Sequence, residues 1–92
     1  MRLSWRNSKQ LLRSATSIGT NVEEANAGQS KKDFAMKMSI ASKEAIETRY
    51  WLKLLDRSQL IKNDYSSYLD SIDQIIRVLT KIVKTTQESL AK

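Results

Sequence analysis

Glu44 and Glu47 lie three positions apart in a segment whose apolar residues recur at helical spacing. Both carboxylates therefore face one side of a helix, where they could act together, for example as metal ligands. In di-iron helical bundles such carboxylates are combined with Glu-x-x-His motifs, which supply nitrogen ligands. The chain contains no histidine, so we predict no metal site and no cofactor. We predict instead a structural network of ion pairs between helices. Its cations are Arg13, Lys43 and Arg49, and its carboxylates are those of Glu24, Glu44 and Glu47.

The residue types that most enzymes need are scarce in this chain. Cysteine and histidine are both absent, which removes the thiolate nucleophile and the commonest general base. Ser14, Thr16 and Ser17 have no base or orienting acid near them in any geometry that the sequence implies. The sequence therefore predicts a protein that is not an enzyme and has no small-molecule substrate.

Basic side chains form two stripes at helical spacing, and 16 Lys and Arg against 10 Asp and Glu give a net charge of +6. Such stripes are commonly solvated helix faces, but they can also track the phosphates of a nucleic acid. On the second interpretation they are the candidate nucleic-acid-binding residues. The first stripe is Arg2, Arg6, Lys9 and Arg13, and the second is Arg77, Lys81 and Lys84.

Two adjacent aromatic residues, Tyr50 and Trp51, lie between Arg49 and Lys53. Stacking on nucleic-acid bases is one interpretation of aromatic rings among cations. Contacts in the core or between copies of the chain are the interpretation that we favour, because aromatic residues at helical spacing usually pack.

The apolar residues that carry the fold recur at alternating steps of three and four, the a/d pattern of packed helices. With no proline and no strand-like alternation, the sequence predicts a single all-α domain over 1–92, with helices at about 3–26, 30–56 and 65–90 in an antiparallel, up-and-down bundle. A second line of apolar residues widens the apolar face (the seam) of each helix. We therefore expect a fourth helix or another protomer to cover the apolar surface that three helices leave exposed. The predicted seams are Leu11, Ala15, Ile18, Val22 and Ala25; then Phe34, Met38, Ala41, Ala45, Thr48, Leu52 and Leu55; then Tyr65, Leu69, Ile72, Ile76, Leu79 and Val83.

Particular residues predict how the helices end and approach one another. Gly28 suits a left-handed C-terminal cap, and Ser30 with Asp33 resembles a capping box. Asp64 or Ser66 can cap the third helix. Gly19, inside the first helix, predicts a close approach by a neighbouring helix.

Several blocks of the sequence resemble a bacterial family, the four-helix-bundle proteins encoded in intervening sequences of 23S ribosomal RNA genes. The blocks are 10–25 (QLLRSATSIGTNVEEA), 30–34 (SKKDF), 40–41, 43–44 and 47–55 (ETRYWLKLL). The resemblance implies a ring-like homo-oligomer, typically a pentamer, with suspected association with RNA. It also implies a relation to the accessory proteins of diversity-generating retroelements, which are basic pentamers. Members normally carry a complete helix before the segment that begins here near Leu3, so the resemblance implies that the first helix of the family is missing or truncated here.

Charge and resemblance together lead to two hypotheses about function. The first is a non-enzymatic oligomer that associates with ribosomal or other structured RNA, or with an RNA–protein assembly, through its basic helix faces. The alternative is a structural or adaptor protein that binds a partner helix or protein and no nucleic acid. No apolar run is long enough to cross a membrane, so we expect a cytoplasmic protein.

Overall fold

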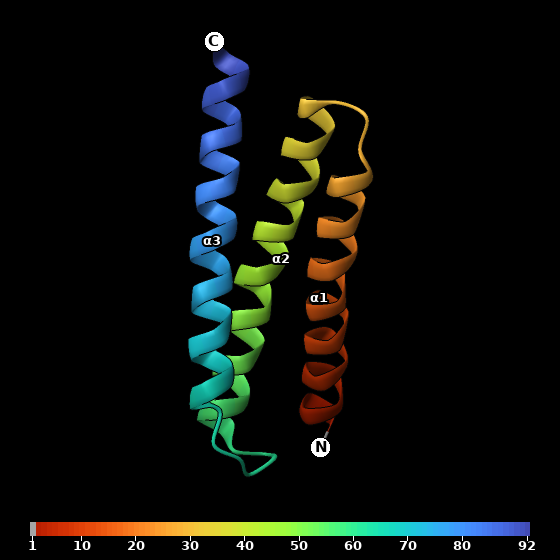
Figure 1. Ribbon diagram of the computed structural model, residues 1–92. Helices are drawn as coiled ribbons and strands as arrows, with labels where there is room; N and C mark the ends of the chain where they lie inside the picture. Colours follow the sequence, from red (N-terminus) through yellow and green to blue (C-terminus); the bar gives the residue numbers. More distant parts are fainter. Residues whose placement is uncertain (1) are drawn as a thin grey trace.

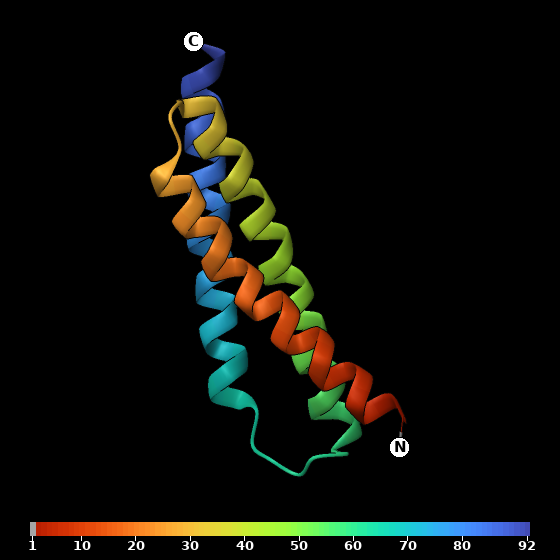
Figure 2. The ribbon, with the colours of Figure 1, turned by 90° about the vertical axis from the view of Figure 1, so that its right-hand side faces the viewer.

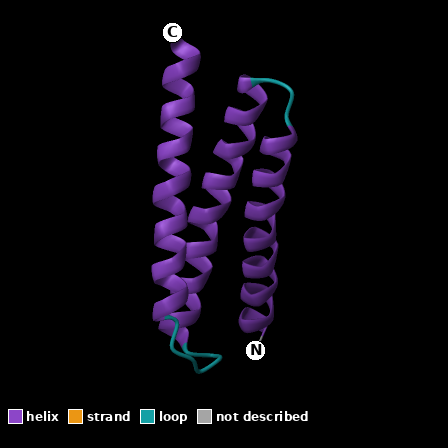
Figure 3. Cartoon of the chain, in the orientation of Figure 1, coloured by secondary structure: helices purple, strands orange, loops and turns teal. Residues whose placement is uncertain are grey.

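The computed structural model describes residues 2–92 of the chain, with side chains from Arg6 onward. Over this range it contains three helices and no strand: α1 (Arg2–Ala27), α2 (Lys31–Ser58) and α3 (Ser66–Ala91) (Figure 1, Figure 3). The all-α prediction is confirmed, and the helix bounds differ from the sequence-based ones by at most two residues.

The helices run up, down and up, and α2 is the central member of the array. α1 and α3 each pack against α2, but no Cα of α1 lies within 8 Å of a Cα of α3 in the described chain. The result is an elongated body of 49 × 20 × 16 Å, with the ends of the chain at opposite poles (Figure 1). Figure 2 shows the loop that joins α2 to α3 crossing at the pole where α1 begins.

Local hydrogen bonds set the ends of α2. Ser30 has an extended backbone, and its Oγ accepts a hydrogen bond from the backbone N–H of Asp33 at 3.0 Å, so the predicted N-cap is confirmed. At the other end Gln59 adopts a left-handed conformation with φ 50°, and its N–H donates to the carbonyl of Leu55 at 2.9 Å.

At the start of α3, Asp64 satisfies a first-turn donor. Its Oδ1 accepts from the backbone N–H of Ser66 at 3.0 Å and from the hydroxyl of Ser66 at 2.5 Å. These hydrogen bonds favour the charged carboxylate and lower the pKa of Asp64 below its ordinary value of 3.8.

The prediction for Gly28 is wrong in its conformation. No glycine of the described chain has a positive φ, and the N–H of Gly28 donates to the carbonyl of Ala25 at 3.2 Å instead. A Cβ at this position would lie only 3.1 Å from that carbonyl oxygen. Glycine is favoured here by a close backbone approach rather than by left-handed geometry.

The predicted seams of α2 and α3 are confirmed. All seven α2 positions are buried except Phe34, which is partly buried. Tyr65, just before α3, is buried, and the five predicted positions within α3 are buried or partly buried. The middle of the α2 seam consists of small side chains: Ala41 and Ala45 have no exposed surface, and Thr48 follows them and is also buried. Small side chains let both neighbouring helices approach α2 closely.

Four of the five predicted seam residues of α1 are buried or pack against the core, but Ala15 is not among them, and polar residues share the seam. Asn7, Ser14 and Asn21, seven positions apart, are buried, whereas Ala15 is exposed. Ser14 Oγ donates to the carbonyl of Leu11 at 3.1 Å and accepts from Thr48 Oγ1 at 2.8 Å. The hydroxyls thus satisfy each other across the α1–α2 interface, which makes their burial tolerable.

A large apolar surface stays exposed on the flanking helices. Leu12 on α1 is 70% exposed, and Tyr68, Ile75 and Val78 on α3 are also exposed. The total accessible surface is 6624 Å², against about 5,500 Å² for a compact monomer of this mass. The excess, about 1,100 Å², is comparable with the roughly 800 Å² that one partner contributes to a stable protein–protein interface.

Gly19 is exposed, and a Cβ built on it meets nothing within 4 Å. Within this chain the prediction of a close helix approach at Gly19 is therefore wrong.

We predict that Gly19→Ala raises the free energy of unfolding by about 1 kcal/mol, because alanine costs less conformational entropy in a helix and has open space here. Urea unfolding of both proteins at the same protein concentration measures this change in the free energy of unfolding. A lower stability together with a lower oligomer mass would contradict the prediction and show that another copy packs against Gly19.

Candidate nucleic-acid interface

The basic stripe of α1 divides into two parts. Arg6 and Lys9 are exposed, and neither forms an ion pair with any residue whose side chain the structure describes. Arg13 is turned instead toward α2. Arg2, the first member of the predicted stripe, has its side chain outside the described residues.

Arg13 lies between the two glutamates that the sequence singled out. Its Nη1 lies 3.2 Å from Glu44 Oε2, its Nη2 pairs with Glu47 Oε2, and its Nε donates to Gln10 Oε1 at 3.0 Å. One guanidinium thus joins two carboxylates that would otherwise repel each other on one helix face. This arrangement leaves Arg13 little capacity for a phosphate.

The remaining members of the predicted polar network have other partners. Glu24 pairs with Lys37 at 3.3 Å, and Arg49 pairs with Asp73 on α3 at 3.1 Å. Lys43 is exposed and forms no ion pair with the described side chains. The network is therefore a set of separate, partly exposed pairs that tie α2 to each neighbour.

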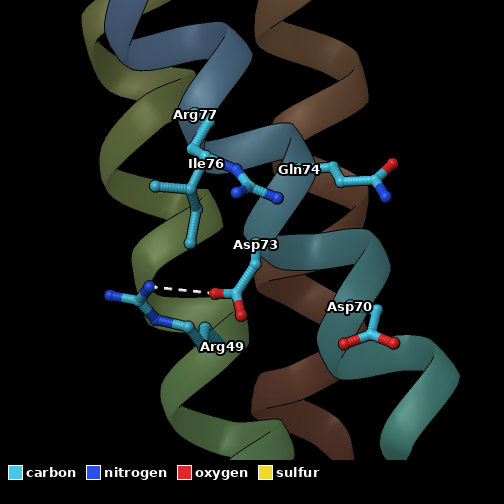
Figure 4. Close-up of a pocket in the computed structure, with 6 residues that line it drawn as sticks. All are labelled: Arg49, Asp70, Asp73, Gln74, Ile76 and Arg77. Carbon is cyan, nitrogen blue, oxygen red and sulfur yellow. Dashed lines mark hydrogen bonds and ion pairs between the residues drawn. The ribbon is translucent and has the colours of Figure 1, made fainter.

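The basic stripe of α3 lies on a helix that has no Cα within 8 Å of α1 in the described chain. Arg77 shares a groove of about 410 Å³ with Arg49, Asp70 and Asp73 (Figure 4). In the close-up, the Asp73 carboxylate points to Arg49 and the Arg77 side chain lies one turn farther along α3. Nearby carboxylates thus offset the charge of Arg77, whereas Lys81 and Lys84 are exposed.

A larger groove, about 730 Å³, opens between the start of α1 and the C-terminal half of α2. Arg6 and Lys9 line it together with Asn7, Tyr50 and Trp51. Tyr50 is exposed, and its ring lies edge to face with that of Trp51, with centroids 4.9 Å apart. Of our two preferred interpretations, packing in the core fits the partly buried Trp51 but not the exposed ring of Tyr50, and contact between copies of the chain stays a prediction.

Sequence reasoning did not identify Asn7 as a site residue. Asn7 is 1% exposed, and both its Nδ2 and Nε1 of Trp51 are buried without a hydrogen-bond partner in the described chain. The only available signal was the polar repeat of Asn7, Ser14 and Asn21 at heptad spacing. It is easily missed because a helical seam is usually recognised by its apolar residues.

Two other kinds of site are absent from the part of the chain that the structure describes. Among the described residues no three acidic, histidine or cysteine side chains form a group that could hold a metal ion. None of the described helices is both long and apolar enough to span a membrane.

The model of the 23S rRNA-intervening sequence protein family matches residues 4–81, which include nearly all of α1, the whole of α2 and most of α3. The chain belongs to this family. The resemblance in the sequence blocks of α1 and α2 is thereby confirmed. No curated protein matches the chain.

A solved structure has a similar fold. It is the crystal structure of a protein of unknown function from the S23 ribosomal protein family of Bacteroides thetaiotaomicron. The two are 48% identical, with a TM-score of 0.79, over 85% of this chain and 73% of the other. The family and the helical fold are therefore supported independently.

We predict that the Arg13 cluster stabilises the fold of the intervening-sequence protein modestly. Arg13→Met should lower the free energy of unfolding by about 1 kcal/mol, because it leaves Glu44 and Glu47 close together without their shared cation. The loss should shrink at high salt, which screens the repulsion.

Glu24→Gln is the matched control for this measurement. The Glu24–Lys37 pair is more exposed than Glu44, so its loss should cost no more than about 0.5 kcal/mol. Equal effects of the two substitutions in urea unfolding would contradict a special role for Arg13.

Proposed function

We propose that the chain is a non-enzymatic, oligomeric helical protein that associates with RNA, or with an RNA–protein assembly, through the basic start of α1. The observation that carries the proposal is the pair of exposed cations, Arg6 and Lys9, beside the exposed ring of Tyr50. Exposed cations near an aromatic ring are the elements by which proteins bind single-stranded nucleic acid. The family's name, which refers to 23S rRNA, points in the same direction.

Charges elsewhere on the same pole support this proposal. Lys53 and Arg57 follow Tyr50 at helical spacing on α2, and both are exposed. The α3 stripe contributes less to the proposed surface, since Asp70 and Asp73 lie beside Arg77. Binding of RNA is thus proposed chiefly for the pole that carries the start of α1 and the end of α2.

The second part of the proposal is self-association into a ring, for which the family resemblance implies five copies. The surface in excess of a compact monomer, about 1,100 Å², supports an interface of ordinary size. A ring would repeat Arg6 and Lys9 in every protomer, so that several weak contacts act together on one RNA.

We predict that light scattering at micromolar concentration gives a mass well above the 10.6 kDa of one chain, and near five times that value for a pentamer. Exposed Tyr68, Ile75 and Val78 provide the physical reason, because soluble monomers rarely expose so much contiguous apolar surface. A mass equal to that of a single chain would overturn the oligomer.

We predict that the affinity for labelled ribosomal RNA fragments falls steeply with salt, since cations bind RNA by releasing its counterions. Changing Arg6 and Lys9 together to Ser should flatten the slope of log K against log salt by about 0.7 for each lost phosphate contact. Changing Arg13 as well should add little, because its guanidinium is held by two glutamates.

The matched control removes two equal charges from the opposite pole. Lys32 and Lys92 are both exposed, so the double change to Ser alters the net charge equally without touching the α1 stripe. Equal slopes for the two double variants would show that only net charge matters. Undetectable binding by the wild type at low salt would favour the second candidate, a protein adaptor that uses the exposed apolar face of α3.

A further inference from the structure

The side of α2 that faces away from both neighbouring helices carries exposed apolar side chains. The buried seam of α2, to which Met38 and Ala45 belong, is the side that packs on α1 and α3. Met36 and Lys43 precede these two residues by two positions, a rotation of about 200°, so they lie on the opposite side of the helix. We call the exposed residues of that side the outer face of α2. They are Lys32, Met36, Ile40, Lys43 and Ile46.

The apolar residues of the outer face cannot be covered by the helices that the structure describes. Met36 is 53% exposed, Ile40 is 37% exposed and Ile46 is 47% exposed. A helix at a surface normally has one apolar stripe, and α2 already buries its own against two neighbours. Single apolar residues are common on protein surfaces, but three on one side of a helix within about 15 Å form a patch. Another molecule is needed to cover it.

Unpaired positive charge accompanies these apolar residues. Lys43 lies in the middle of the outer face and Lys32 at its start, and neither forms an ion pair with a side chain that the structure describes. The carboxylates of Glu44 and Glu47, which follow Lys43 on α2, are held by Arg13 of α1. Complementary charge on a partner would therefore be negative. The partner must combine apolar side chains with carboxylates.

Other kinds of partner fit this face less well. A lipid bilayer would place the ammonium group of Lys43, in the middle of the apolar patch, among acyl chains, where a charge is costly. RNA offers phosphates to the two lysines but no aliphatic surface to the apolar residues between them. A second copy of the chain has no acidic helix among those described, since α1 and α2 carry net positive charge and α3 is neutral.

We propose that the outer face of α2 binds an acidic amphipathic helix of a different protein. The apolar side chains of that helix pack on Met36, Ile40 and Ile46, and carboxylates beside its apolar stripe pair with Lys32 and Lys43. Lys32 and Ile46 are 14 positions apart. The face is therefore about 21 Å long, which corresponds to about four turns of a partner helix.

The probe is a displayed library of amphipathic helices of about 18 residues, or five turns. Leucine, isoleucine or valine occupies the seam positions, and every residue type is allowed at the flanking positions. The library is selected on the full chain, and we expect Asp and Glu to be enriched at the flanking positions. The best acidic helix should bind at least about tenfold more tightly than its copy with Lys at each acidic position. Equal affinities, or no selected helix, would overturn the proposal.

Two matched pairs of variants locate the bound helix. Lys43→Glu and Lys84→Glu change the net charge equally at exposed helical positions. Ile46→Ala and Ile75→Ala truncate isoleucines that are 47% and 40% exposed. The changes on α2 should each weaken binding of the acidic helix about tenfold, through charge repulsion and through lost apolar contact. The changes on α3 should leave binding unchanged. Equal losses for the two members of a pair, with folding confirmed by circular dichroism, would refute the site.

The remaining occupants of the outer face are distinguished by further measurements. A lower oligomer mass for Ile46→Ala without added helix would show that another copy covers the face, against the proposal. Binding of phosphatidylserine vesicles that Lys43→Glu abolishes, with no acidic helix selected, would assign the face to lipid and also refute it.

The outer face shares no residue with the surface proposed for RNA, which is built on Arg6, Lys9 and Tyr50. The two proposals can therefore fail separately. Tight binding of the acidic helix that depends on Lys43, without RNA binding by the wild type, supports the outer-face site and refutes only the association with RNA. Salt-dependent RNA binding without a selected acidic helix refutes only the outer-face site.

Discussion

The packing of both outer helices on α2 is the interaction on which the whole structure depends. Because no Cα of α1 lies within 8 Å of a Cα of α3, close packing between helices in the described chain runs through α2. The fully buried Ala41 and Ala45 permit this, since they let the two neighbours come close from different sides. A larger side chain at either alanine would therefore disturb two interfaces at once.

The same arrangement explains why the protein has so much exposed apolar surface. In a closed bundle each helix buries its apolar stripe against two neighbours. Here α1 and α3 have one neighbour each, so Leu12 on one helix and Val78 on the other stay exposed. The ion pairs of Arg13 and Arg49 fasten α2 to each outer helix but cannot cover these surfaces.

The sequence predicted the helices and nearly all of the three seams because the apolar residues follow the ordinary helical repeat. It misplaced Ala15 because the repeat in α1 was traced through apolar residues, whereas Ser14 occupies the buried position and is satisfied by Thr48. Ion pairs at Glu44 and Glu47 were predictable because the two lie on one helix face and the chain has no histidine that would make them metal ligands; Arg13 provides these pairs. Whether a basic side chain forms an ion pair or stays free in solvent depends on contacts between helices, and no local sequence pattern encodes these contacts. For that reason Arg13 and Lys9 looked alike in sequence and differ in the fold.

The polar row of Asn7, Ser14 and Asn21 also constrains the register of α1 on α2. Sliding α1 by one turn would move Ser14 away from Thr48 and place a hydroxyl or an amide against alanine and leucine. An apolar seam would tolerate such a slip with little loss, whereas a polar seam penalises it with unsatisfied groups. The polar row therefore contributes less hydrophobic stabilisation than an apolar row would, but it favours a single alignment of the two helices. That alignment also fixes which residues of α2 line a groove together with Asn7.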